Sequence, residues 1–277
     1  MRRTPKSTLK KFMRSRKALA IPVTYLILFA SLLAIISITY GFAVARISAK
    51  GAALKLSVAK QNMQTLDDAV RSVAWSFGAS KTAYMEDCGG VFQTQSSKDL
   101  SLTLTDEQTF AYTVLNSSIG KVCYVLEAST ESQEGLYVKG DSRAIINQSA
   151  YPMTQLYFAR GENAQQLTLC YRPMATVLAA GTTDGKPLNF IRVYVISLAS
   201  SEALTASGSF YVKASALNVT VESQLYNLNS TVSSLALKAV SDGVQTTVWL
   251  PIESNAEGAF VNLEILTCHI KIQRVNA

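Results

Sequence analysis

The strongest constraint on this chain is a stretch of 28 residues without a charged side chain, from Ala18 to Ala45. As a helix rising about 1.5 Å per residue, this stretch would measure about 42 Å, which exceeds the ~30 Å hydrocarbon core of a bilayer. A helix buried in a soluble protein rarely runs so far without a charge, and the apolar region of a cleaved secretory signal is shorter, about 7 to 15 residues. The stretch therefore predicts a membrane-spanning helix over residues 19–45.

Basic residues are concentrated on one side of this stretch. The protein has 26 Lys and Arg against 19 Asp and Glu, and its formal net charge of +7 would by itself suit a nucleic-acid-binding protein. Eight of the 26 lie in the first 17 positions, and the other 18 are balanced by the 19 acidic residues. Four basic residues lie within the fifteen positions after the stretch: Arg46, Lys50, Lys55 and Lys60. The positive-inside rule therefore predicts a cytoplasmic N-terminus and an extracellular C-terminal part, with the membrane and not nucleic acid as a partner.

A second helical pattern follows the uncharged stretch. Apolar residues recur in steps of three and four along one face: Ala49, Ala52, Leu56, Ala59, Met63, Leu66, Val70, Val73 and Phe77. With Gly78 as the stop, the two patterns predict one helix over residues 19–77, about 90 Å long, with Gly41 and Gly51 as the places for a bend. The apolar face would pack on the protein's own globular domain or against other copies, and the pattern fits both.

Residues 78–277 have the texture of a β protein, with short alternating runs rich in Val, Thr, Tyr and Phe. The predicted strands cover 82–85, 91–95, 100–105, 121–127, 136–139, 144–147, 155–160, 167–172, 190–198, 209–214, 217–225, 246–250 and 260–275. Helical spacing predicts a short helix over 230–242, and a shift of apolar phase after Ile265 predicts a bulge or a bend between sheets. The chain is thus predicted to be α+β: a long N-terminal transmembrane and amphipathic helix, then an all-β, sandwich-like extracellular head. The head would be one sandwich or two modules that meet near residue 185.

This order of features resembles the precursors of archaeal type IV pilins and pilin-like proteins, which carry a class III (prepilin-type) signal peptide. The resemblance covers about the first 80 residues and rests on the basic leader, the sequence Arg16-Lys17-Ala18 and the abrupt uncharged helix. Pro22 and Val23 are similar to the Pro-Val pair early in archaeal pilin helices, placed one residue later. Val23 stands where bacterial pilins usually have a glutamate.

The resemblance implies that a prepilin peptidase cleaves after Ala18, removes the leader of residues 1–18 and leaves Leu19 as the new N-terminus. It also implies that helix 19–77 assembles with copies of itself or with other pilins into a cell-surface filament that displays the β head. The large head favours a minor or specialised subunit with a structural or adhesive role. The alternative is an uncleaved, single-pass membrane-anchored surface protein whose β domain binds a ligand or partner.

Patterns typical of catalysis or metal binding are missing from the sequence. His269 is the only histidine, and the adjacent acidic pairs Asp67-Asp68, Glu86-Asp87 and Asp106-Glu107 favour solvated turns over acid–base catalysis. Asp87-Cys88-Gly89-Gly90 predicts a hairpin turn, with a Ca²⁺ site as the less favoured alternative because no alternating carboxylates follow. There is no phosphate-binding glycine loop and no nucleophile elbow. The sequence therefore predicts no enzyme, no metal and no cofactor.

Two kinds of modification are predicted for the outer part. The four cysteines are Cys88, Cys123, Cys170 and Cys268. None lies in a Cys-x-x-Cys pair, and outside the cell they would form one or two disulfides or remain buried thiols. Four Asn-x-Ser/Thr sequons, which predict N-glycosylation, begin at Asn116, Asn147, Asn218 and Asn229. Asn218 lies in a predicted strand, so its side chain has to face outward to be modified.

Overall fold

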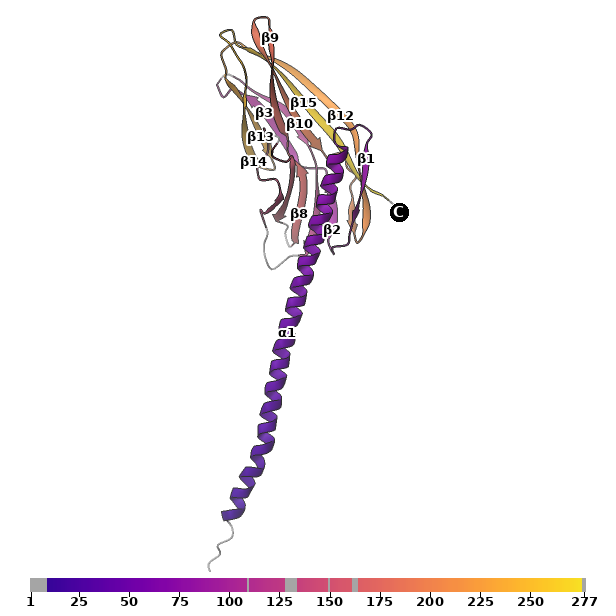
Figure 1. Cartoon of the computed structure of the whole chain (residues 1–277), viewed down its shortest axis with the longest axis vertical. Helices are drawn as coiled ribbons and strands as arrows, with labels where there is room; N and C mark the ends of the chain where they lie inside the picture. The colour runs from indigo at the N-terminus through magenta and orange to yellow at the C-terminus, as the bar shows by residue number, and fades with distance from the viewer. Residues whose placement is uncertain (1–8, 109, 128–133, 149, 161–163, 276–277) are drawn as a thin grey trace, which may run out of the picture. The chain divides into compact units, whose positions relative to one another are not determined.

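The computed structural model describes residues 9–108, 110–127, 134–148, 150–160 and 164–275. It divides into two compact units, Met1–Ala53 and Leu54–Ala277, and we call the second the β domain. One helix, α1 (Leu9–Val73), contributes residues to both units (Figure 1). The fold is α+β, as predicted, because this long apolar helix is followed by several β-sheets. The first eight residues of the predicted leader lie outside the described residues.

The helix ends earlier than predicted. The apolar pattern placed its end at Phe77, whereas α1 ends at Val73. Trp75 has a φ of 68°, in the left-handed region that an α-helix does not contain. Its ring packs edge-on against Tyr194, with 5.5 Å between the ring centroids. Phe77 is exposed and does not continue the apolar face of the helix.

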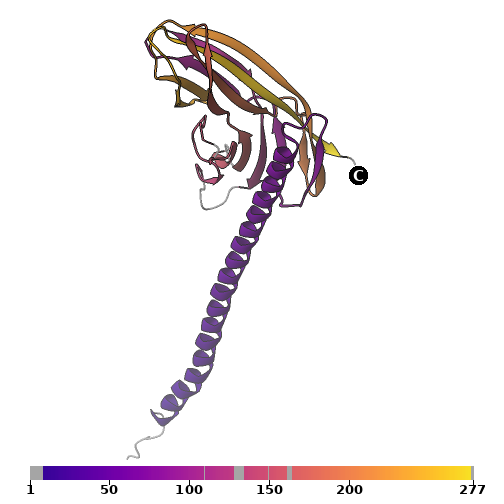
Figure 2. The same ribbon diagram turned by 45° about the horizontal axis from the view of Figure 1, so that its top comes forward.

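Fifteen described strands form three sheets. Sheet A has the order β1 (Ser80–Met85), β12 (Phe210–Leu228), β15 (Ala259–Val275), β10 (Lys186–Ser197), β9 (Met174–Thr183). Sheet B has the order β11 (Thr205–Ser207), β2 (Val91–Gln95), β5 (Lys121–Glu127), β8 (Ala164–Tyr171), β7 (Thr154–Arg160), β6 (Tyr137–Lys139). Sheet C has the order β14 (Val244–Pro251), β13 (Ser234–Ser241), β3 (Asp99–Thr105), β4 (Ala111–Ser118). Neighbouring strands are antiparallel except β10 and β15, which are parallel, and Figure 2 shows β12 and β15, in orange and yellow, as the longest strands of the domain.

Most of the strands predicted from alternation are confirmed. The runs 91–95 and 121–127 are β2 and β5 to the residue, and the runs 209–214 and 217–225 together form β12. Strands β4, β9, β11 and β13 were not predicted. The predicted division near residue 185 falls in the hairpin between β9 and β10, and the β domain is one compact unit.

The short helix predicted over 230–242 is wrong. The segment forms strand β13, which pairs with β14 on one side and with β3 on the other. Leu235, Ala236 and Leu237 are all buried, because β13 is covered on both faces at this point. A strand buried on both faces does not alternate apolar with polar residues. Its apolar residues can then fall at helical spacing, which is why the sequence predicted a helix here.

The hairpin predicted at Asp87-Cys88-Gly89-Gly90 is also wrong. Strand β1 pairs with β12 in sheet A, whereas β2 pairs with β5 and β11 in sheet B, so these four residues connect two sheets. The carboxylate of Asp87 accepts a hydrogen bond from the backbone N–H of Gly89 at 2.8 Å and closes the turn. The run 144–147 is not a strand either, since only Ile146 forms an isolated bridge, to Met174.

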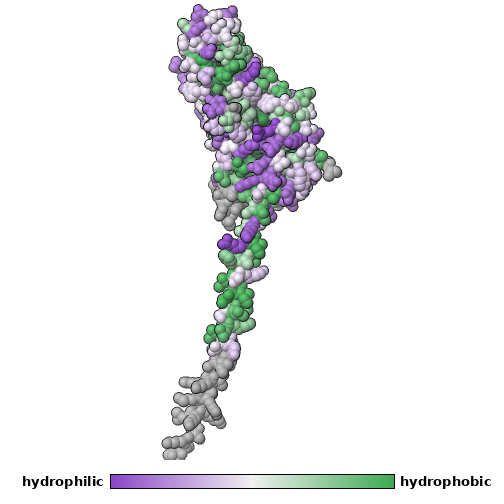
Figure 3. Space-filling model, in the orientation of Figure 1, coloured by the Kyte–Doolittle hydropathy of each residue, from purple (hydrophilic) through white to green (hydrophobic). Residues whose placement is uncertain are grey.

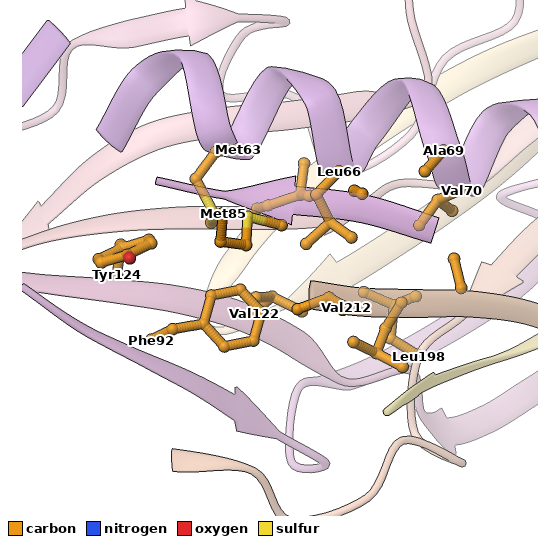
Figure 4. Packing of buried hydrophobic residues seen from close by; sticks show 14 of the residues in the cluster. Met63, Leu66, Ala69, Val70, Met85, Phe92, Val122, Tyr124, Leu198 and Val212 are labelled. Carbon is orange, nitrogen blue, oxygen red and sulfur yellow. The ribbon is translucent and has the colours of Figure 1, made fainter. Parts of the chain in front are cut away.

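The β domain has two hydrophobic cores. Core 1 lies between α1, sheet B and one end of sheet A, and core 2 lies between sheet C and the other end of sheet A. The buried face of α1 in core 1 consists of Ala59, Met63, Leu66, Ala69, Val70 and Val73. Figure 4 shows Met63 and Leu66 directed toward Met85 and Phe92 in this core. The predicted amphipathic face is thus confirmed from Ala59 to Val73, where it packs on the protein's own domain.

Strand β15 contributes to both cores with opposite faces. Its alternate residues are buried in core 2 up to Ile265 and in core 1 from Cys268 onward. The strand keeps an unbroken register with β10 over Phe260–His269, so residues of odd and even number point to opposite faces of the sheet. The shift of apolar phase in the sequence therefore marks the point after Ile265 where the buried side chains of β15 change from one face of the sheet to the other. The register shift lies on the neighbouring strand β12, between Ala216 and Asn218.

Candidate functional site

The first candidate site is the surface of α1 within the unit Met1–Ala53. Every side chain from Pro22 to Lys50 is exposed. Figure 3 shows hydrophobic residues, in green, along this part of the helix. The large apolar ones among them are Val23, Tyr25, Leu26, Ile27, Leu28, Phe29, Leu32, Leu33, Ile35, Ile36, Ile38, Tyr40, Phe42, Val44 and Ile47. This helix is long and apolar enough to cross a membrane, and it is the one such helix in the described residues. We call the segment 22–50 the apolar surface of α1.

Three hydroxyl groups on the apolar surface of α1 are satisfied within the helix. Ser31, Ser37 and Thr39 each donate a hydrogen bond of 2.8 Å to the backbone carbonyl three or four residues earlier. Lipid tails and apolar side chains offer no partner to a hydroxyl, so a polar group that faces them has to be satisfied locally. Lipid or other apolar helices can therefore cover this surface without leaving these three hydroxyls unpaired.

The predicted processing residues lie on the backbone of α1: Arg16, Lys17, Ala18 and Leu19. Pro22 lies inside the helix and is the fourth residue after the predicted cleavage point. Proline has no N–H, and its ring crowds the carbonyl four residues earlier. The carbonyl of Ala18 therefore lacks its helical hydrogen bond from position 22. That carbonyl belongs to the predicted scissile peptide bond, so the bond lies in a weakened turn of the helix.

Within the β domain, α1 carries a fully buried carboxylate. Asp67 is 0% exposed, and it accepts hydrogen bonds from the hydroxyls of Thr154 at 2.7 Å and Tyr171 at 3.0 Å. Its second oxygen pairs with the ammonium of Lys139. Burial, and after it the charge of Asp67, raise the pKa of Tyr171, so this hydroxyl stays protonated and donates. The prediction of a solvated acidic pair is therefore wrong for Asp67, whereas its neighbour Asp68 is exposed.

A second polar contact fixes α1 to the end of β1. The amide of Asn62 brackets the backbone of Glu86: Nδ2 donates to the carbonyl at 2.8 Å, and Oδ1 accepts from the N–H at 3.1 Å. The ammonium of Lys60 lies 5.2 Å from the ring centroid of Phe158, on sheet B. Sequence reasoning missed both Asn62 and Asp67. Asn62 lies next to Met63 and Asp67 next to Leu66, at the border of the predicted apolar stripe, which is the one signal that could have found them.

A buried arginine organises the loops at the edge of sheet B. Arg172 pairs with the carboxylate of Asp141 and donates to the carbonyl of Pro152 at 3.1 and 3.0 Å. Arg143 adds a two-point ion pair to the same carboxylate, at 3.0 and 2.7 Å. Hydrogen bonds from Arg143, and after them from Arg172, hold the pKa of Asp141 well below its ordinary value. This cluster joins segments that are distant in sequence and is structural in character.

Acid is expected to weaken the cluster around Asp141. The pKa of Asp141 is lower in the folded state than its unfolded value of about 3.9, so its ionised form stabilises the fold above about pH 4 and this stabilisation is lost as the pH falls. The side chain is 37% exposed, which keeps the contribution small through solvent screening. Asp141→Asn should therefore flatten the fall in Tm between about pH 4 and pH 2, measured by thermal unfolding.

The control for this measurement is Asp184→Asn, in the exposed hairpin between β9 and β10. Asp184 has a φ of 48°, a conformation that asparagine also tolerates, so the exchange should leave both the fold and the acid dependence close to those of the unmodified protein. Identical acid dependence in the two variants would contradict the role given to Asp141.

All four cysteines are free, buried thiols in this structure. Burial raises the pKa of the Cys123 and Cys268 thiols, which keeps these two protonated and unreactive. The buried Lys98 donates to the sulfur of Cys170 at 2.8 Å and to the amide oxygen of Gln155 at 3.4 Å. These contacts give the cysteines a place in the packing of the β domain.

His269 occupies a structural position on β15. Its Nε2 lies 3.2 Å from the hydroxyl of Thr220, across the strand pair β12–β15. In the part of the chain that the structure describes, no group of three His, Cys, Asp or Glu residues is arranged to hold a metal ion. The acidic residues Glu86, Asp87, Asp106 and Glu107 lie in links between strands.

The asparagines of all four sequons are exposed: Asn116, Asn147, Asn218 and Asn229. Asn218 lies beside the register shift of β12, and its side chain reaches solvent as modification would require. The amide of Asn147 donates to the carbonyl of Trp249 at 3.3 Å, a contact that a glycan would replace. Glycosylation at these positions stays a prediction.

Known proteins offer no template for these sites. No protein-family model, no curated protein and no solved structure matches this chain. The function therefore has to be inferred from the apolar surface of α1, the residues before it and the β domain.

Proposed function

We propose that this protein is a pilin-like structural subunit of an archaeal type IV pilus-type cell-surface filament, assembled through its N-terminal apolar helix. The observation that carries the proposal is that one part of α1 is exposed and apolar while another part is buried in the β domain. Its segment 22–50 is exposed and largely apolar, while its segment 59–73 is built into core 1 and fixed there by Asn62 and Asp67. One helix therefore offers an apolar surface to other molecules and is firmly part of a β domain.

Assembly would exchange one apolar environment for another. The apolar surface of α1 is soluble in lipid or against similar helices, and a head-to-tail contact that does not close on itself propagates into a filament. Eight basic residues stand in the first 17 positions. Each uncompensated charge would cost several kcal/mol in an apolar bundle, so removal of the leader has to precede assembly. Uncleaved, the leader keeps the N-terminus in the cytoplasm and the subunit in the membrane.

Processing would take place between Ala18 and Leu19, after the basic pair Arg16-Lys17. A peptidase has to bind its substrate in extended form, and a helical peptide bond resists this because its carbonyl is hydrogen-bonded. Pro22 removes the hydrogen bond to the carbonyl of Ala18 and so lowers the cost of opening this turn. Pro22 is therefore a positioning residue for the proposed cleavage.

Replacement of Pro22 by alanine is expected to slow processing by about three- to tenfold, since it restores a helical hydrogen bond to the carbonyl of Ala18. The rate can be followed in cells with an active prepilin peptidase, from the ratio of precursor to mature chain after a pulse of synthesis. Val23→Ala, at the neighbouring exposed position, leaves the hydrogen-bond pattern unchanged and should be processed like the unmodified chain. Equal rates for both variants would rule out the role given to Pro22.

The proposed function is tested by sequencing the N-terminus of the protein from the membrane and surface fractions of cells with an active prepilin peptidase. A terminus at Leu19, together with surface filaments that disappear when the protein is deleted, is the expected result. An intact Met1 or Arg2 terminus in both fractions would overturn the processing step and with it the assembly mechanism.

The second candidate is an uncleaved, single-pass surface protein whose β domain binds a ligand, with α1 as anchor only. A cleft of about 590 Å³ between the ends of β3 and β4 and the end of β12 favours it. The same sequencing experiment separates the two candidates, because the anchor keeps its leader.

A further inference from the structure

One cleft of the β domain lies where sheets A and C open to solvent. Strand β4 is the edge of sheet C. Strand β12 pairs with β1 through residues 210–215, and among the described residues no strand pairs with its residues 217–228 on that side. Between them is a cleft of about 590 Å³, within the range of about 300–1,000 Å³ that is typical of small-ligand sites. The described residues that line it are Asp106, Phe110, Tyr112 and the segment 224–230. We call it the aromatic cleft.

Three aromatic rings form one wall of the aromatic cleft. Phe110 and Tyr226 are stacked, 14° apart in plane and 6.4 Å between centroids. Tyr112 lies 5.6 Å from Phe110 and 5.5 Å from Tyr226, at tilts of 33° and 38°. Tyr226 is buried and Tyr112 is 51% exposed, so the group presents ring surface to solvent from a fixed base. The hydroxyl of Thr105 donates to the carbonyl of Phe110 at 2.7 Å and holds that residue in place.

The polar groups of the aromatic cleft are oriented by their own contacts. Gln224 accepts from the hydroxyl of Tyr226 at 2.9 Å through its amide oxygen, which directs its NH₂ group elsewhere. Asn227 and Asn229 both accept from the ammonium of Lys186, at 2.7 and 3.1 Å, again through their amide oxygens. Each amide therefore has its oxygen engaged within the protein and its two N–H donors directed away from that contact.

We infer that the aromatic cleft binds a neutral carbohydrate. A sugar ring has an apolar face of C–H groups, which packs on aromatic rings, and a rim of hydroxyls, which pair with amides and carboxylates. The three rings supply the first, and the amides with the carboxylate of Asp106 supply the second. The described lining contains the carboxylate of Asp106 and no Lys or Arg, and the nearby ammonium of Lys186 is already engaged by the amide oxygens of Asn227 and Asn229. A phosphate or another anion is therefore disfavoured relative to an uncharged ligand.

The sugar could be a glycan attached to this chain or a glycan of another molecule. Asn229 lies on the wall of the aromatic cleft and begins a sequon, so a glycan on this residue could fold back into the cleft of its own chain. A glycan of another molecule would enter from solvent. Both sources use the same rings and amides, and they differ in whether glycosylation of Asn229 blocks or leaves free the binding of added sugar.

The test uses the full chain in detergent micelles, made in a host without N-glycosylation, and a panel of immobilised neutral oligosaccharides of hexose and N-acetylhexosamine units. The unmodified protein should bind members of the panel, and Tyr112→Ala should bind them about tenfold more weakly. Tyr84→Ala is the matched control, because Tyr84 is 49% exposed, contacts Tyr211 and lies near the opposite end of β12. Gln224→Ala changes a second lining residue, at an exposed position, and should also weaken binding. Weaker binding by both variants would show that the effect of Tyr112→Ala does not come from a folding defect of that protein alone.

Absence of binding to the whole panel, or equal loss in the Tyr84→Ala and Tyr112→Ala proteins, would overturn the inference. Protein from the natural host then identifies the source. If that protein binds the panel only after Asn229→Gln, the cleft holds the chain's own glycan. If it binds without this change, the cleft is open to a glycan of another molecule. Neither result depends on cleavage at Ala18.

Discussion

Replacement of Asp67 by alanine is expected to lower the free energy of unfolding of the β domain by about 2–5 kcal/mol, chiefly because two buried hydroxyls lose their acceptor. The carboxylate of Asp67 is the acceptor for Thr154 and Tyr171 and the partner of Lys139. Without it the hydroxyl of Tyr171, which is enclosed in core 1, has lost its acceptor, and each such buried group costs about 1–3 kcal/mol. Lys139 is partly exposed and recovers some hydration, so most of the loss falls on the two hydroxyls.

The measurement is equilibrium unfolding by denaturant of the full chain in detergent micelles, followed by tryptophan fluorescence. Asp68→Ala provides a closely matched control: it removes the same side chain one position along the helix, at an exposed site, and should change the stability by no more than about 0.5 kcal/mol. If the Asp67→Ala protein unfolded like the Asp68→Ala protein, the buried network could not be what holds α1 to sheet B.

Replacement of Ala18 by phenylalanine is expected to stop maturation, with a fall in cleavage of about a hundredfold or more. Under the proposed function Ala18 occupies a site in the peptidase that accepts small residues. The benzyl side chain of phenylalanine is much larger than the methyl group of alanine and would not fit this site. The precursor would keep its basic leader, and that charge would exclude it from an apolar helix bundle. The expected result is a full-length chain in the membrane fraction and no surface filament.

The comparison for Ala18→Phe is Ala43→Phe, an equally large change at an exposed position within the apolar surface of α1. It should leave the N-terminus of the mature chain at Leu19, as in the unmodified protein. Intact mass or N-terminal sequencing distinguishes the two chains, since the leader contains 18 residues. Normal maturation of the Ala18→Phe protein would favour the anchored, uncleaved alternative.

The helix was predictable from sequence because one physical signal dominates it. The stretch from Ala18 to Ala45 has no charged residue and is long enough to cross a membrane as a helix. The apolar residues from Ala59 to Val73 recur at the spacing of one helix face. The end of the helix was not predictable in the same way. Trp75 leaves helical geometry where its ring meets Tyr194, a residue more than a hundred positions away.

Strands were predictable from alternating apolar and polar residues where one face of the sheet is buried and the other is exposed to solvent. Leu100, Leu102 and Leu104 of β3 alternate with polar residues and were recognised for that reason. Strand β13 has buried residues on both faces and lost its alternation, and the second half of β9 is exposed and consists of small residues. Which strands pair is a long-range property. The parallel pairing of β10 with β15 joins segments about 70 residues apart and has no local signature.

The candidate site in the β domain could not be predicted from the sequence. The aromatic cleft brings Phe110 and Tyr112 against Tyr226, over a separation of more than a hundred residues. In the sequence these are single aromatic residues in β-like surroundings. Asp67 was misread for a related reason, since two adjacent aspartates indicate a solvated surface unless one of them meets buried donors from another part of the chain.

Because β15 contributes opposite faces to the two cores, we expect the β domain to unfold as one cooperative unit. Loosening of core 2 at the sheet C end frays the same continuous strands, β12 and β15, on which α1 and core 1 depend. Damage at either end is therefore shared by the whole domain and is not confined to one lobe. A force applied to the segment 59–73 of α1 would likewise be resisted by both cores together.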